Sequence, residues 1–221
     1  MFWSPASPDT GLYARKLSMN IQPLLDKSVC EHSHLCPRQI LGVRLGLAGM
    51  KSLGFDSPPD DKQLLVITET DGCFVDGLSA ATNCTVGHRT LRVEDYGKVA
   101  AVFVDVKIGR TIRVAPVLDI RERAYAFVSE EPDRYAAQLQ AYQTMPDEKM
   151  FTCIEVQLAA SIEAILSRPG MRVNCSACGE EIMNEREIHQ SETILCHACA
   201  QGGYYHDVEQ NAIFSCTARL V

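Results

Sequence analysis

The chain has 221 residues, of which 46% are hydrophobic, and a formal net charge of −7, so it can bury one sizeable core and a small second unit. The acidic balance argues against a nucleic-acid-binding surface, because neutralising phosphates requires clustered basic side chains. No apolar run reaches the roughly 18 to 20 residues that cross a bilayer, and the first residues lack the apolar centre of a signal peptide. We therefore expect a cytoplasmic protein that contacts no membrane.

The first quarter of the chain predicts two helices behind a loose N-terminal arm at residues 1–16. Apolar spacing indicates the first helix at about residues 18–30. The second helix is predicted to begin at Pro37, since proline suits the first helical position, and to stop at Gly54. Three glycines interrupt it: Gly42, Gly46 and Gly49. Each lowers helix propensity by roughly 1 kcal/mol, so we expect them to serve close packing.

A histidine and cysteine constellation lies directly before the second helix. His32, His34 and Cys36 alternate in sequence, which in an extended loop places both imidazoles on one side. Cys36 would lie at the helix N-terminus, where the helix dipole favours a thiolate, the form that acts as nucleophile or metal ligand. The alternative is an exposed histidine pair beside a buried thiol.

The middle of the chain predicts strands around a further helix. Residues 63–69 and 91–117 indicate strands, and the stretch at 99–106 is apolar on most of both faces, which predicts a central strand. The helix between them is expected to begin near Phe74. Cys73 and Cys84 form a thiol pair there, with Asp76 one helical turn after Cys73. Buried structural cysteines are the alternative for this pair.

The last part of the core predicts helices at residues 120–143 and 153–166. A break at residues 168–170 (Arg-Pro-Gly) follows, so we expect a core domain of residues 1–168 and a second domain with tail at 169–221. Because strands and helices do not alternate as regular βαβ units, the fold class is predicted to be α+β. We expect a mixed or antiparallel sheet with packed helices.

The second domain carries two CxxC pairs separated by 17 residues: Cys175, Cys178, Cys196 and Cys199. This spacing is typical of a four-thiolate zinc site, in which each pair forms a tight turn that aims both sulfurs at one point. Disulfides or free thiols are the alternative. Because four thiolates close the coordination shell, the zinc is expected to be structural.

Several motifs together resemble the FmdE family of formylmethanofuran dehydrogenase subunits. The family's H-G-H-x-C-P-G signature corresponds to residues 32–38, its C-x-x-D-A segment to 73–77, its G-C-T-x-G-K segment to 83–88, and its D-Y-G-K to 95–98. The resemblance covers about residues 20–165. Three positions depart from the family pattern: Ser33, Arg38 and His88. Of these, Arg38 brings a cation beside Cys36.

The resemblance implies an α+β core that forms a homodimer and a C-terminal treble-clef zinc finger, whose second CxxC opens a helix. It also implies a link to a larger oxidoreductase complex of methanogenesis-type one-carbon metabolism. The family name does not establish that such a subunit is itself an enzyme.

The leading hypothesis is a core pocket of metal- or thiol-dependent redox character around His34, Cys36 and Cys73. We expect a further group of candidates close by: His32, Asp76 and Cys84. Such a soft ligand set suits a possible second metal, namely zinc, copper or iron, whereas a sulfur pair alone suits redox exchange. The alternative is a non-catalytic accessory subunit, or a protein that delivers a metal or ligand to a larger oxidoreductase.

Overall fold

The computed structural model describes residues 20–30, 34–59, 61–128, 131 and 133–205. The predicted N-terminal arm and His32 lie outside these residues. The chain divides into two compact units, Met1–Ala159 and Ala160–Val221. No helix in the described ranges is long and apolar enough to cross a membrane.

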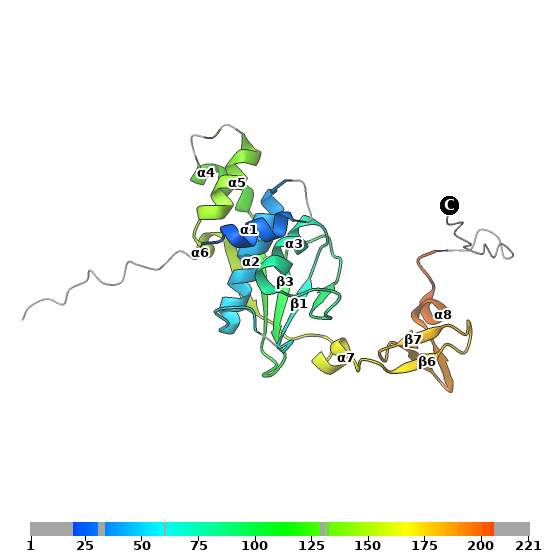
Figure 1. Cartoon of the computed structure of the whole chain (residues 1–221). Coiled ribbons are helices and arrows are strands. Elements are labelled where there is room, and N and C mark those ends of the chain that lie inside the picture. Colours follow the sequence, from blue (N-terminus) through cyan, green and yellow to red (C-terminus); the bar gives the residue numbers. More distant parts are fainter. Residues whose placement is uncertain (1–19, 31–33, 60, 129–130, 132, 206–221) are drawn as a thin grey trace, which may run out of the picture. The chain divides into compact units, whose positions relative to one another are not determined.

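The first unit is built on one five-stranded sheet (Figure 1). Its strands are β1 (Leu64–Thr68), β2 (Leu91–Val93), β3 (Ala101–Asp105), β4 (Thr111–Pro116) and β5 (Phe151–Glu155). They lie in the order β2-β1-β3-β4-β5, with β1 and β2 parallel and the other neighbouring pairs antiparallel. This mixed sheet with packed helices confirms the predicted α+β class. The strand predicted to be central is β3, which lies in the middle of the sheet.

The helices of this unit are α1 (Gln22–Val29), α2 (Pro37–Leu53), α3 (Cys73–Thr82), α4 (Ile120–Phe127), α5 (Arg134–Thr144) and α6 (Asp147–Met150). Helix α2 contacts β3, β4 and β5, and it also packs against α1, α3 and α5. As predicted, α2 begins at Pro37 and ends at Gly54, whose φ of 89° is left-handed. It is therefore the central helix of the unit (Figure 1).

Glycines set the contact between α2 and α3, as the sequence predicts for α2. A Cβ on Gly42 would lie 2.1 Å from the carbonyl oxygen of Phe74, and one on Gly77 would lie 2.2 Å from a carbonyl oxygen of α2. One turn further along both helices, a Cβ on Gly46 would lie 2.8 Å from the Cβ of Ala81. The contacts advance in the same direction along both helices. Helices α2 and α3 therefore run parallel, with both N-termini at the same end.

Helices α5 and α6 are tied to α2 by the partly buried guanidinium of Arg44. The Arg44 guanidinium donates to the carbonyl oxygens of Tyr142 at 2.8 Å and Met145 at 2.7 Å. It also pairs with the Asp147 carboxylate at 2.6 Å. This clamp fixes α5, whose Tyr142 is buried in the core, against the central helix.

The helix predicted at residues 153–166 is wrong in its first half. Residues up to Glu155 form β5, which pairs antiparallel with β4, and only α7 (Ile162–Leu166) is helical. The β-branched Thr152 and Ile154 fit a pleated strand better than a helix. The spacing of apolar residues alone did not distinguish a strand from a helix at residues 153–155.

The helix predicted at residues 120–143 is two helices. Helix α4 ends at Phe127, and α5 begins after Asp133. The Asp133 carboxylate accepts the backbone N–H groups of Tyr135 at 3.1 Å and Ala136 at 3.2 Å, which caps the new helix. The capping aspartate was the sequence signal for this break.

The second unit holds α7, two antiparallel hairpins and a short helix. These elements are β6 (Arg172–Asn174) with β7 (Glu181–Met183), β8 (Ile188–Gln190) with β9 (Thr193–Leu195), and α8 (His197–Gln201). Among its described residues, only Cys175 and Ile182 are buried. The burial of two side chains does not stabilise a folded unit, so this unit requires a further source of stability such as a disulfide or a metal ion.

Candidate functional site

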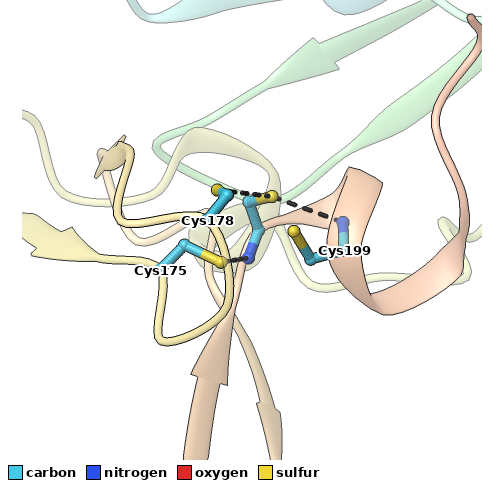
Figure 2. Close-up of side chains that lie close together, drawn as sticks. Cys175, Cys178 and Cys199 are labelled. Carbon is cyan, nitrogen blue, oxygen red and sulfur yellow. Dashed lines mark hydrogen bonds between the residues drawn. The ribbon is translucent and has the colours of Figure 1, made fainter. Parts of the chain in front are cut away.

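Four cysteine side chains gather in the second unit. Their sulfur atoms all lie within 4.8 Å of one another, and the Sγ atoms of Cys178 and Cys196 are 4.0 Å apart (Figure 2). A tetrahedral zinc ion with Zn–S bonds of about 2.3 Å places its sulfurs about 3.8 Å apart. The cluster therefore has the spacing of a four-thiolate metal site, as the two CxxC pairs predict.

The backbone aims these sulfurs at one point. After Cys175 the chain turns tightly, with Gly179 N–H donating to the Cys175 carbonyl at 2.9 Å and Gly179 at φ 78°. Cys196 caps α8, where its Sγ accepts the Cys199 N–H at 3.4 Å. The Cys196 N–H in turn donates to Cys175 Sγ at 3.3 Å (Figure 2). The first pair thus lies on a turn between strands and the second opens a helix, as expected of a treble-clef finger.

The protonation of the cluster also fits a bound dication. Backbone N–H groups of Cys178 and Cys196 lower the pKa of Cys175 to about 6. Hydrogen bonding to Cys196 and to the other two sulfurs raises the pKa of Cys199 to about 12, because one thiolate disfavours the next. A bound dication would offset the repulsion between neighbouring thiolates, so these four cysteines suit zinc.

A second site lies in the first unit, where the parallel packing of α2 and α3 brings two cysteines together. Cys36 is the N-cap of α2 and Cys73 is the first residue of α3. Both cysteines line one cavity, and the neighbouring Cys36 is among the causes that raise the pKa of Cys73. Sequence reasoning proposed both residues, and the tertiary structure places them in the lining of the same cavity.

Cys36 is held by a buried network. Its carbonyl oxygen accepts the backbone N–H of Gln39 at 3.1 Å, and its own N–H donates to the Gln39 side-chain oxygen at 2.8 Å. The Gln39 amide is fully buried and donates to the Ser28 carbonyl at 2.8 Å, which ties it to α1. Cys36 is therefore fixed at the N-terminus of α2.

The surroundings of Cys73 favour its protonated form. Burial raises the pKa of its thiol, and both the hydrogen bond to Cys36 and the nearby charge of Asp76 raise it further.

The pair opens into a cavity of about 590 Å³ between α2, α3, α4 and α5. Its polar lining residues are Cys36, Arg38, Cys73, Arg121, Glu122, Tyr135, Gln138 and Tyr142. Its apolar lining residues are Pro37, Leu41, Val99, Pro116, Val117, Leu118 and Ile120. Burial raises the pKa of Tyr142 to about 12, so its hydroxyl stays protonated.

The other predicted site residues are placed differently. His34 is exposed and is not among the cavity-lining residues. Asp76 lies near Cys73 but does not line the cavity, and Cys84 is buried in the core, where its thiol donates to the Leu64 carbonyl at 3.5 Å. Among the residues that the structure describes, the four finger cysteines are the only group of three or more metal ligands gathered closely enough for an ion.

Sequence reasoning did not find the far wall of the cavity. Arg121 from α4 and Tyr135, Gln138 and Tyr142 from α5 follow Cys36 by more than 80 residues. No local motif marks them, since only the packing of α5 on α2 brings them to the thiol pair. Arg38, by contrast, was visible as a cation next to Cys36.

The family model described as "FmdE, Molybdenum formylmethanofuran dehydrogenase operon" matches residues 31–152, which is more than half of the chain. A "Probable S-adenosyl-L-methionine-binding protein" of Archaeoglobus fulgidus is 36% identical over 86 residues, covering 38% of this chain. The match spans only 24% of that protein's length.

One solved structure shares the fold. It is the crystal structure of a tungsten formylmethanofuran dehydrogenase FmdE-like protein from Syntrophus aciditrophicus. The TM-score is 0.56 at 22% sequence identity, over 86% of this chain and 97% of that one.

Proposed function

The chain belongs to the FmdE family, and we propose that its core is a thiol redox module with a zinc-stabilised finger. The observation that carries this proposal is the presence of both Cys36 and Cys73 in the lining of one ligand-sized cavity. The sulfur at the helix N-terminus is the nucleophile, and the protonated sulfur of Cys73 is the resolving thiol.

The reaction is an exchange with a disulfide supplied by a second molecule. The Cys36 thiolate attacks one sulfur of that disulfide, forms a mixed disulfide and releases the other sulfur as a thiolate. Cys73 then loses its proton and attacks Cys36 Sγ, which releases the second sulfur. Two electrons pass to the substrate, which leaves as two thiols, and the protein is left with a Cys36–Cys73 disulfide.

Incubation of the zinc-loaded full chain with oxidised glutathione, followed by peptide mapping without reductant, tests this proposal. We expect a Cys36–Cys73 disulfide in the wild type. In Cys73→Ser, glutathione should remain attached to Cys36, because no resolving thiol is present. Cys153→Ser is the matched control, since Cys153 is an exposed thiol on β5 outside the cavity.

Two results would overturn the redox proposal. The first is a wild-type chain in which Cys36 and Cys73 stay reduced or acquire glutathione independently. The second is metal analysis that finds two ions per chain, one of which is lost in Cys36→Ser but not in Cys175→Ser. That outcome would support the predicted core metal instead.

We propose that the finger binds zinc and that its role is structural. The four sulfurs leave no coordination position for water or substrate. The proposed division of roles assigns the chemistry to residues 1–168 and a supporting role to residues 169–221.

The alternative proposal is an accessory subunit that acts within a larger oxidoreductase of one-carbon metabolism, for which the family description is the support.

We also propose a homodimer. Strand β5 is an edge of the sheet, and its Thr152, Cys153 and Ile154 are exposed, so a second copy could cover this edge. Light scattering of the full chain tests the dimer, and a monomeric mass at micromolar concentration would contradict it.

A further inference from the structure

Three helix N-termini meet at the cavity beside the thiol pair. Helix α2 contributes Cys36 and Arg38 to its lining, α3 contributes Cys73, and the first turn of α4 contributes Arg121 and Glu122. Each N-terminus carries a partial positive charge from its unpaired backbone N–H groups. The backbone alone therefore makes this end of the cavity favourable for an anion.

The charged side chains of the lining strengthen this preference. The lining contains two arginines, Arg38 and Arg121, and one carboxylate, that of Glu122. Within the described part of the chain, neither Arg38 nor Arg121 is in an ion pair. Asp119, at the start of α4, is already matched by Arg123 at 2.8 Å, and this contact lowers the pKa of the Asp119 carboxyl. Among the described residues, no carboxylate therefore competes with a ligand for these two arginines.

Apart from Gln138 and the two thiols, the rest of the cavity lining is apolar and aromatic. Leu41, Val99 and Val117 line it, and α5 adds the rings of Tyr135 and Tyr142. A volume of about 590 Å³ lies within the range of about 300 to 1,000 Å³ that small-molecule sites occupy. An inorganic ion would leave most of this space unfilled, and a folded macromolecule would not enter it.

We propose that the cavity binds a small organic anion, with a carboxylate or phosphate at Arg38 and Arg121 and an apolar body against α5. This inference rests on the proposed function, in that the bound molecule is the one presented to Cys36. Guanidinium groups recognise both kinds of anion through paired hydrogen bonds, so the shared chemistry is an anionic head on an apolar or aromatic body.

Calorimetric titration of the zinc-loaded full chain carrying Cys36→Ser and Cys73→Ser tests binding without thiol chemistry. The probes are 4-phenylbutyrate, phenyl phosphate, the neutral 4-phenylbutanol and inorganic phosphate. We expect the two organic anions to bind at least about tenfold more tightly than the alcohol, because a charge-assisted hydrogen bond contributes at this level. The tighter of the two identifies the head group.

The matched variants are Arg38→Gln and Arg121→Gln, with Lys51→Gln on α2 as the control outside the cavity. Each cavity variant should weaken the organic anions about tenfold and leave the alcohol nearly unchanged. Thermal melts check that the variants are folded. In the protein that keeps both arginines, binding of the organic anions should weaken as the salt concentration rises.

The inference is overturned if the alcohol binds as tightly as the organic anions, if none of the organic probes binds, or if the control variant weakens binding as much as the cavity variants. A chain that forms the Cys36–Cys73 disulfide without preferring anions would contradict the ligand class alone. A chain that binds the anions but forms no disulfide would contradict the redox proposal alone.

Discussion

Gly42 of α2 and Gly77 of α3 lie so close that neither helix has room for a side chain at the contact. A Cβ on Gly42 would lie 2.1 Å from the Phe74 carbonyl oxygen, and one on Gly77 would lie 2.2 Å from that of Gln39. Because the atoms on the other side are backbone, a methyl group cannot be accommodated by turning a side chain. This contact also fixes the relative position of the two helix N-termini that carry Cys36 and Cys73.

Alanine at either glycine should therefore separate the helices. Although alanine improves helix propensity by roughly 1 kcal/mol, overpacking against backbone should outweigh it and lower the free energy of unfolding by about 2 kcal/mol. Urea denaturation measures this change. Gly87→Ala is the control, since a Cβ there meets nothing within 4 Å and should change stability by less than about 0.5 kcal/mol. Equal midpoints for Gly42→Ala and wild type would contradict the close contact.

The reactivity of Cys73 should depend on pH in a defined direction. Burial and the neighbouring Cys36 raise the pKa of this thiol, so its thiolate forms at higher pH than in an unfolded peptide. At pH 8, iodoacetamide should label Cys73 more slowly than it labels the same residue in urea. The difference between the two labelling rates should disappear as the pH rises above the raised pKa of Cys73.

Cys36→Ser should accelerate that labelling at pH 8, because it removes one of the causes that raise the Cys73 pKa. Burial, the largest cause, remains, so the rate should stay below that of the unfolded chain. Mass spectrometry of the Cys73 peptide gives both rates. A slower or unchanged rate in Cys36→Ser would show that the two sulfurs do not interact.

Zinc removal should unfold the finger and leave the core folded. The finger buries only Cys175 and Ile182 among its described residues, whereas a structural zinc contributes an apparent binding free energy on the order of 10 to 16 kcal/mol. Chelation or Cys175→Ser should therefore erase dispersed amide signals of residues 171–203 in NMR spectra. The core signals and the core melting temperature should persist, and a single melt that shifts as a whole would contradict this independence.

Arg44→Met should loosen α5 and α6. The substitution leaves the carbonyl oxygens of Tyr142 and Met145 without their guanidinium donor and Asp147 without its cation. Loss of charge-assisted bonds at a side chain that is 11% exposed should cost about 2 to 3 kcal/mol, measurable by urea denaturation. Arg123→Met, at a more exposed ion pair, should cost less than about 1 kcal/mol.

Local signals determined much of the first unit. Pro37 and Gly54 mark the ends of α2, and the glycines inside it predicted a close contact, because each of these residues has a backbone requirement that acts within one or two turns. The same local reasoning failed at β5, whose exposed residues lack the alternation of a half-buried strand. It also missed the capping role of Asp133, so two helices were predicted as one.

The sequence by itself determined the family motifs and the four zinc-type ligands, since a CxxC pair brings its sulfurs together through a single turn of backbone. Only the tertiary structure decided which core cysteines meet. Cys36 and Cys73 line the same cavity because α2 and α3 run parallel across a glycine contact, while Cys84 lies in the core and His34 does not line the cavity. Arg121 and Tyr142 line the same cavity as Cys36, although they follow it by more than 80 residues. Residues so far apart in the sequence are brought together only by the packing of the helices, so no local motif identifies them.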